Sequence, residues 1–264
     1  EFVGMEASGG YERAVRDALS LAGFDVQVFD PGRIRHYARS KGRRAKNDGI
    51  DAAVIAEFTA LQTATASPVD PAREEAAGLI KARRLLVDKC ADLRRAFATA
   101  PAAAKAALQT AIDALKAAIK SLEDETDAKI KAQPALSARA AALQTAPGVG
   151  QVTARALAVL MPELGSISGR QASALVGVAP FDRDSGQFRG QRHIAGGRSD
   201  ARRALYMAAL VATTRAKGEL AAFYAGLRKR GKPAKVALVA CMRKLIVRLN
   251  AMLAKGKTWE ASPA

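Results

Sequence analysis

The sequence has few of the residues that build small covalent or metal-bound scaffolds. It holds two cysteines and two histidines in 264 residues, which excludes a disulfide framework and a zinc finger. Cys90 and Cys241 lie far apart, as is usual in a reducing cytoplasm. Aromatic residues make up only 5%, which argues against proteins that stack bases on an aromatic sheet. No stretch of 18 apolar residues occurs without a charge, and the N-terminal residues lack the pattern of a signal peptide.

Acidic residues are scarce relative to basic ones. The chain has 42 Lys and Arg against 25 Asp and Glu, a formal net charge of +17. Residues 70–129 are nearly neutral, so the excess lies on either side of them. Three acid-poor runs hold much of it: Arg33, Arg35, Arg39, Lys41, Arg43, Arg44 and Lys46; Arg183, Arg189, Arg192, Arg198, Arg202 and Arg203; Arg228, Lys229, Arg230, Lys232, Lys235, Arg243, Lys244 and Arg248. A charge run can be a solvated surface, but three runs around a neutral segment favour contact with nucleic-acid phosphates.

The first 66 residues are predicted to form an α/β piece. Residues 2–5 are a short apolar run, residues 11–22 have helical spacing, and residues 24–29 alternate as a strand does. This strand–helix–strand order predicts a parallel pair of strands. Because two strands cannot make a stable sheet, we expect further strands before Glu1.

Residues 67–133 are predicted to form a helical spacer. Ser67-Pro68 and Asp70-Pro71 mark a linker, and Pro101 separates two segments with heptad spacing. The heptad positions are Leu79, Leu86, Cys90, Leu93 and Phe97, then Leu108, Ile112, Leu115, Ile119 and Leu122. The pattern predicts a long antiparallel helical hairpin, either a coiled coil or an ordinary helix pair.

Residues 134–264 are predicted to form a helical domain. Helices are expected at residues 171–178, 200–217 and 234–253, whereas residues 181–199 are rich in Gly and Arg and show no periodicity.

A glycine turn within residues 143–160 has a more specific form. A helix leads into the turn Gly148-Val149-Gly150, and a second helix begins after it. Such a turn can point backbone N–H groups at a phosphate. It resembles the helix-hairpin-helix element of DNA-binding proteins, although an ordinary helix–helix turn remains the alternative.

Three carboxylates are candidates for a metal site. Glu6 directly follows the first predicted strand, and Asp48 and Asp51 lie three residues apart on a predicted helix. Taken singly, Asp48 can be a helix N-cap and Asp51 can favour the helix dipole. Together the three are hard oxygen ligands suited to Mg²⁺ and phosphate chemistry.

Ser185 is the candidate nucleophile. A Ser-Gly pair in a loop is usually only a turn, but this one lies among Arg183, Arg189 and Arg192. Guanidinium groups can clamp phosphoryl oxygens and stabilise the charge that develops on them.

Taken in order, these motifs resemble those of one family. They read Met5-Glu6-Ala7-Ser8-Gly9-Gly10-Tyr11-Glu12, Lys46-Asn47-Asp48-Gly49-Ile50-Asp51-Ala52, Pro147-Gly148-Val149-Gly150, and Val178-Ala179-Pro180 through Asp184-Ser185-Gly186. The ordered set resembles the DEDD-type insertion-sequence transposases, the family of the Piv invertase and the bridge-RNA-guided serine recombinases.

The resemblance implies a RuvC-like N-terminal domain, a helical spacer and a C-terminal transposase domain. It implies that Glu6, Asp48 and Asp51 are the second, third and fourth acids of a Mg²⁺ site, and that Ser185 is a nucleophile. The first acid has no counterpart, so we expect a truncated chain that is inactive alone. DNA, a structured guide RNA and a homo-oligomer, dimer or tetramer, are the implied partners, in a bacterial cytoplasm at the nucleoid.

The sequence therefore predicts a DNA recombinase of an insertion sequence. The expected nucleic-acid contacts are Arg33, Arg35, Arg43, Arg44, Gly148, Gly150, Arg183, Arg189, Arg192, Arg198 and Arg202. Two other functions stay open at this point: a non-catalytic helix-hairpin-helix binding protein, and a RuvC-like junction nuclease in which Ser185 is only a turn residue.

Overall fold

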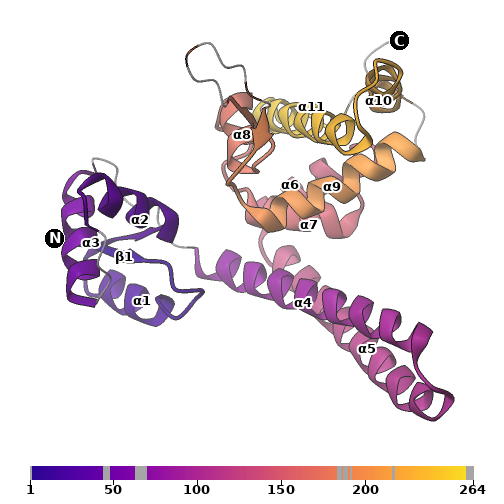
Figure 1. The fold of residues 1–264 in the computed structure, drawn as a ribbon, viewed down its shortest axis with the longest axis horizontal. Helices are drawn as coiled ribbons and strands as arrows, with labels where there is room; N and C mark the ends of the chain where they lie inside the picture. Colours follow the sequence, from indigo (N-terminus) through magenta and orange to yellow (C-terminus); the bar gives the residue numbers. More distant parts are fainter. Residues whose placement is uncertain are drawn as a thin grey trace. The chain divides into compact units, whose positions relative to one another are not determined.

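The protein is mainly helical and divides into two compact units. The computed structural model describes residues 2–43, 48–62, 70–182, 186, 190, 192–215 and 218–259, with the backbone alone for residues 48 and 50. The units are Glu1–Val69 and Asp70–Ala264 (Figure 1). The prediction placed the first boundary three residues earlier, and its second boundary near residue 133 stays a prediction.

The first unit contains the predicted parallel strand pair. Strand β1 (Phe2–Glu6) pairs with β2 (Asp25–Phe29), and α1 (Arg13–Leu21) connects them. The first residues of the basic run, from Arg33 to Arg39, lie on a helix that was not predicted, α2 (Pro31–Ser40). Its signal is local rather than periodic: Pro31 occupies the first turn, and the Asp30 carboxylate accepts a hydrogen bond from the Arg33 N–H at 3.2 Å.

Helix α3 (Asp48–Ala60) packs directly on β1. A Cβ added at Gly4 would lie 1.8 Å from Thr59 Oγ1, so the strand can approach the helix only through a residue without a side chain. Val54 of α3 is buried with Phe29, and the ring of Phe58 meets that of Phe29 edge-on at 5.0 Å. This packing places the carboxyl end of β1 beside α3.

The second unit begins with the predicted helical hairpin. Helices α4 (Pro71–Thr99) and α5 (Ala102–Lys131) pack against each other and turn at Ala100 and Pro101 (Figure 1). Of the predicted seam residues, Cys90 and Ile112 are buried, whereas the leucines at the other positions are half-buried. The hairpin is confirmed, and a coiled-coil type of packing stays a prediction.

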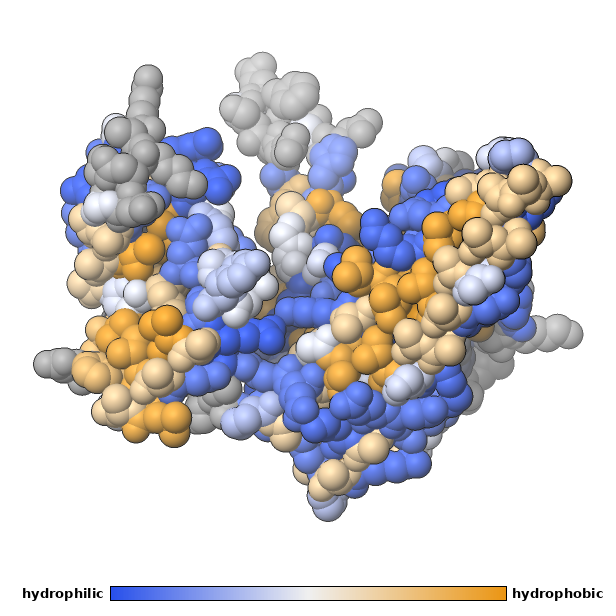
Figure 2. Space-filling model, turned by 90° about the horizontal axis from the view of Figure 1, so that it is seen from below, coloured by the Kyte–Doolittle hydropathy of each residue, from blue (hydrophilic) through white to orange (hydrophobic). Residues whose placement is uncertain are grey.

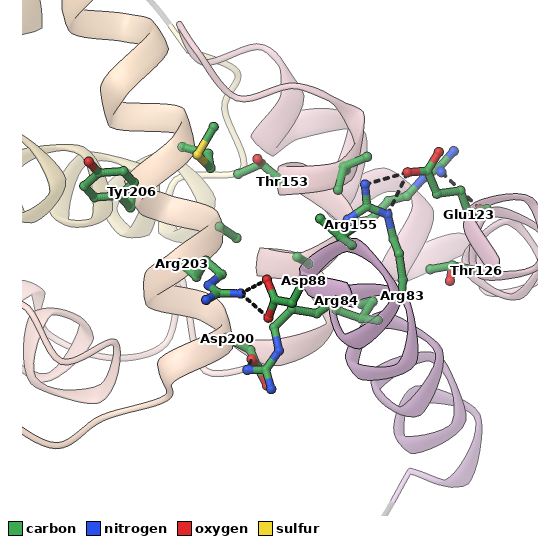
Figure 3. A pocket seen from close by; sticks show the side chains of 16 residues that line it. Arg83, Arg84, Asp88, Glu123, Thr126, Thr153, Arg155, Asp200, Arg203 and Tyr206 are labelled. Carbon is green, nitrogen blue, oxygen red and sulfur yellow. Dashed lines mark hydrogen bonds and ion pairs between the residues drawn. The ribbon is translucent and has the colours of Figure 1, made fainter. Parts of the chain in front are cut away.

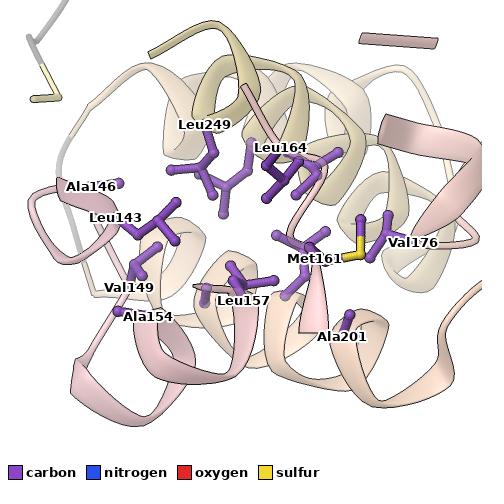
Figure 4. Close-up of a cluster of buried hydrophobic side chains, with 14 of the residues drawn as sticks. Leu143, Ala146, Val149, Ala154, Leu157, Met161, Leu164, Val176, Ala201 and Leu249 are labelled. Atoms are coloured by element: carbon purple, nitrogen blue, oxygen red, sulfur yellow. The ribbon is translucent and has the colours of Figure 1, made fainter. Parts of the chain in front are cut away.

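The rest of the second unit is a bundle of helices around one core. Its elements are α6 (Pro134–Gln144), α7 (Gln151–Leu160), α8 (Gly169–Leu175), β3 (Pro180–Phe181), β4 (His193–Ile194), α9 (Ser199–Thr214), α10 (Glu219–Lys229) and α11 (Ala234–Ala254). Leu143, Leu157 and Leu249 from three of these helices meet in the core (Figure 4). The space-filling view shows hydrophilic side chains over much of one face of the molecule, with apolar ones between them (Figure 2).

One sequence expectation is corrected in this bundle, and a strand pair and a helix in it were not predicted. Residues 181–199 show no periodicity, and the antiparallel pairing of Phe181 with His193 and of Pro180 with Ile194 was not predicted. The helix expected to reach residue 178 ends at Leu175, because Gly177 adopts a left-handed conformation with φ +77°. Helix α10 was not predicted at all.

The turn between α6 and α7 is shaped by its contact with α9. Gly148 has φ +78°, and a Cβ there would lie 2.3 Å from the Ala208 carbonyl oxygen and 2.8 Å from the Ala212 nitrogen. Gly150, in contrast, has φ −76° at the start of α7, and no described atom lies within 4 Å of a Cβ added there. The two glycines therefore have different roles, with Gly148 needed for packing and Gly150 exposed to solvent.

We expect Gly148→Ala to destabilise the second unit by more than about 2 kcal/mol, since it adds both backbone strain and a backbone clash. Gly150→Ala should stay within about 1 kcal/mol of the unsubstituted chain. Urea unfolding followed by the fluorescence of Trp259, the single tryptophan, would measure both. Its backbone N–H donates to Thr145 Oγ1 at 2.8 Å beside this turn, so it reports locally. Equal losses of unfolding free energy for the two variants would contradict the separate roles of Gly148 and Gly150.

Candidate functional site

The first candidate site lies at the carboxyl end of β1. Glu6 is the last residue of the strand and is half-buried. It lines a groove of about 650 Å³ between β1 and α3, together with Ala52 and Ile55. Asp51, next to Ala52, is half-buried in the first turn of α3. The predicted acids Glu6 and Asp51 therefore lie on the strand and helix that form one groove, where ligands of α/β sheets commonly bind.

The chemistry of these donors fits a hard divalent cation. Both offer carboxylate oxygens, the ligands that Mg²⁺ prefers. Among the side chains that the structure describes, no three His, Cys, Asp or Glu residues come together as a metal cluster. The Asp48 side chain lies outside the described residues, although its backbone begins α3. The predicted three-acid site therefore stays a prediction.

The basic run of the first unit is partly neutralised by its own fold. Arg43 Nη2 pairs with Glu57 Oε1 at 2.7 Å, and Lys41 lies 3.5 Å from the other oxygen of the same carboxylate. Burial raises the pKa of Glu57, but the charges of Arg43 and Lys41 lower it by more. The pKa of Glu57 therefore lies below its ordinary value. The guanidinium carbon of Arg33 lies 5.2 Å from the centroid of the Phe58 ring. Arg35 lies on α2, as Arg33 does, and is exposed. Arg44 lies outside the described residues.

Two arginines of the second run join the start of α9 to other parts of the bundle. Arg198 donates to both oxygens of Glu163 at 2.6 Å and to the Leu160 carbonyl at 2.8 Å. Arg202 donates to the Gly196 carbonyl at 2.5 Å and to the Gly177 carbonyl at 3.3 Å. Both were predicted to contact nucleic acid, but these partners show a structural use that sequence reasoning missed.

The centre of the predicted serine site lies outside the described residues, which include neither Ser185 nor Arg183 and Arg189. The strands β3 and β4 flank this segment, and exposed Arg192 pairs with Asp182 just inside them. The structure therefore describes the start and end of the loop but not the serine predicted to be a nucleophile.

A cavity of about 600 Å³ in the second unit has a charged lining that the sequence did not reveal (Figure 3). Helices α4 and α9 meet there through two reciprocal ion pairs. Arg84 pairs with Asp200, and Arg203 donates to both oxygens of Asp88 at 2.7 Å. These partners are more than one hundred residues apart, so no local spacing predicts them. The pairs join the hairpin to the bundle.

The glycine turn offers one surface for an anion. Helices α6 and α7 pack against each other, and exposed Gly150 starts α7. The first N–H groups of a helix have no partner within it and favour negative charge. Gly150 is therefore the turn residue that could face a phosphate, whereas Gly148 faces α9.

Comparison with known proteins places these features in one family. The family model of the IS110-type DEDD transposases matches residues 2–100, and the model of the transposase IS116/IS110/IS902 family matches residues 140–225. The chain belongs to the IS110-type transposases. The first match contains Glu6, Asp48 and Asp51, and the second contains Ser185 and the glycine turn.

Two curated relatives extend this match over almost the whole chain. They are the pilin gene-inverting proteins of Moraxella lacunata and Moraxella bovis, each 26% identical over 97% of this chain and 81% of the relative. Family membership supports an enzyme of DNA transposition or recombination that binds DNA. No helix among the described residues is long and apolar enough to cross a bilayer.

The Arg198–Glu163 pair predicts a pH-dependent stability. Burial raises the pKa of Glu163, but the hydrogen bonds and charge of Arg198 outweigh it and lower that pKa. Because the folded-state pKa is lowered, the pair stabilises the fold above the ordinary carboxyl pKa of 4.5 and loses its effect as pH falls through the folded value.

We therefore expect Glu163→Gln to lower the unfolding temperature at pH 7, and we expect this difference from the unsubstituted chain to shrink as pH falls below 4.5. Thermal melts followed by circular dichroism at stepped pH would measure the gap, which is the difference in unfolding temperature between the variant and the unsubstituted chain. Glu125→Gln, at an exposed position of α5, is the matched control and should leave no such gap. A gap for Glu163→Gln that is as large at pH 3 as at pH 7 would argue against the pair.

Proposed function

We propose that this protein is a DNA recombinase that cuts and rejoins DNA through Ser185. The observation that carries the proposal is the placement of Glu6 and Asp51 on the strand and helix that line one groove, inside the DEDD match. Ser185 lies inside the second match, in an arginine-rich segment. The pilin gene-inverting relatives invert a gene, and inversion requires that strands be cut and rejoined.

In the proposed step the Ser185 hydroxyl oxygen attacks a DNA phosphorus. One bond forms between Ser185 Oγ and phosphorus, and one bond between phosphorus and a deoxyribose oxygen breaks. The serine loses its proton to a base, and the leaving deoxyribose oxygen gains one. The number of phosphoester bonds is unchanged, so attack by another DNA hydroxyl can reverse the step and rejoin strands without an external energy source.

The surrounding charges serve the transition state. Arg183, Arg189 and Arg192 supply guanidinium groups for the phosphoryl oxygens, where negative charge develops. Glu6, Asp48 and Asp51 would hold a Mg²⁺ ion. A bound Mg²⁺ supplies Lewis-acid stabilisation of phosphate charge. The carboxylates would need this cation, because they would otherwise repel the DNA backbone.

The remaining parts of the proposal concern architecture and partners. The first unit would be part of a RuvC-like domain, and α6, α7 and their turn would act as a helix-hairpin-helix element through Gly150. A structured guide RNA and a homo-oligomer complete the proposal. Arg35 and the other exposed basic residues would contact phosphates, so affinity for nucleic acid should fall steeply with salt.

Ser185→Ala should bind DNA normally yet give no recombination. Loss of the nucleophile removes the covalent path itself, so activity should fall by several orders of magnitude, about 10³-fold or more. A nicked suicide substrate tests the same step directly, because a denaturation-resistant protein–DNA adduct should form on Ser185 and be absent from the variant. Strand exchange without an adduct would favour the junction nuclease. Binding without adduct or exchange, with RNA supplied, would favour the non-catalytic binding protein.

Asp51→Asn keeps the size of the side chain but removes its charge. It should abolish metal-dependent strand exchange while leaving DNA binding unchanged or tighter, because one negative charge near the phosphate is lost. Strand-exchange and gel-shift assays on the same preparation separate the two effects. Asp92→Asn, which removes an exposed carboxylate of α4, is the control and should recombine normally. Full recombination by Asp51→Asn would assign this residue to the helix dipole alone.

A further inference from the structure

The loop that directly follows Glu6 has a backbone that few sequences could adopt. Gly9 has φ +79° and Gly10 has φ +116°, both in the left-handed region that other residues rarely enter. Two successive glycines have a large conformational entropy when unrestrained. A loop of this kind would leave the end of β1 poorly fixed unless another group held it.

Glu12 is that group. Its Oε2 accepts hydrogen bonds from the Ser8 N–H at 2.9 Å, the Ser8 hydroxyl at 2.9 Å and the Gly10 N–H at 2.8 Å. Burial raises the pKa of Glu12, but the hydrogen bonds from backbone and hydroxyl donors outweigh it and lower that pKa to about 2. The carboxylate is therefore charged at neutral pH, and charge-assisted hydrogen bonds of this kind are among the strongest in proteins.

The chain is also fixed immediately beyond Glu6. The Ala7 N–H donates to the Phe29 carbonyl at 2.9 Å, which extends the pairing of β1 with β2 by one residue. The β-ladder thus holds Ala7, and the Glu12 carboxylate holds Ser8 and Gly10. These contacts therefore restrain the backbone that directly follows Glu6.

A glycine-rich loop after a strand often binds a phosphate through its free N–H groups. Here the Ser8 and Gly10 N–H groups already donate to Glu12, so the chain's own carboxylate occupies the position that an external anion would take. Phosphate binding by these two N–H groups is thereby disfavoured, and the loop serves the residue before it.

We propose that Glu12 is a positioning residue that fixes Glu6 for its role as a metal ligand at the carboxyl end of β1. The inference rests on the metal site of the proposed function. Glu12 touches neither metal nor DNA in this role, and it acts only through the loop from Ala7 to Gly10. Its contribution is to keep the Glu6 carboxylate in one direction and so lower the entropy lost when a cation binds.

The test combines amide hydrogen exchange with Mn²⁺ binding, measured by electron paramagnetic resonance of free Mn²⁺, on the whole chain. Glu12→Ala should remove the exchange protection of the Ser8 and Gly10 amides and raise the Mn²⁺ dissociation constant by about tenfold or more. Glu12→Gln keeps an acceptor oxygen without charge. Its amide protection and its Mn²⁺ dissociation constant should lie between those of the unsubstituted chain and those of Glu12→Ala. Asp92→Asn removes an exposed carboxylate of α4 that pairs with exposed Arg95, and should change neither readout by more than about twofold. If Glu12→Ala fails to fold, as judged by circular dichroism, Ser8→Ala removes one donor and should produce a smaller change in the same direction.

Two results would overturn the inference in different ways. Loss of amide protection with an unchanged Mn²⁺ dissociation constant would make Glu12 a purely structural residue. Failure of the unsubstituted chain to bind Mn²⁺, with the Ser8 and Gly10 amides still protected, would show that the metal site of the proposed function is wrong, and that Glu12 therefore positions no ligand.

Discussion

The second unit depends on the burial of α7. Residues 153–159 of this helix are all buried, and most of them are alanine, valine or leucine. Small side chains allow neighbouring helices to approach closely, and Gly148 extends this close approach to the backbone of α9. With α7 surrounded, the bundle has one continuous core, and α4 is held against it.

The burial of α7 also explains how several charges are used. Arg155 lies within the buried segment with 7% exposure, and it pairs with Asp127 and reaches the Glu123 carbonyl. A buried guanidinium without such partners would be strongly destabilising. Arg198 pairs with Glu163 at a half-buried position, where an unpaired charge would cost less. Part of the chain's arginine content therefore stabilises the fold, and the exposed remainder provides the positive field expected of a DNA-binding enzyme.

In the first unit, the main constraint acts on the end of strand β1, where Glu6 lies at the edge of a small sheet. Gly4 lets β1 lie against α3, and the resulting groove has Glu6 at its lining. Glu12 then restrains the glycine loop that follows. Packing on one side of the strand and charge-assisted hydrogen bonding on the other thus act on the same residue.

The helical hairpin, the parallel strand pair and the family could be read from the sequence, because these depend on short-range periodicity and on ordered local motifs. Asp51 was correctly predicted to lie on a helix, whereas Glu6 was expected one residue beyond the strand that it in fact ends. The sequence did not show which arginines are paired, that Gly148 and Gly150 have separate roles, or that Glu12 holds the loop after Glu6. The physical reason is that these properties arise from contacts such as Arg84–Asp200 and Gly148–Ala208, which join residues far apart along the chain. The spacing of residues along a sequence carries no record of such contacts.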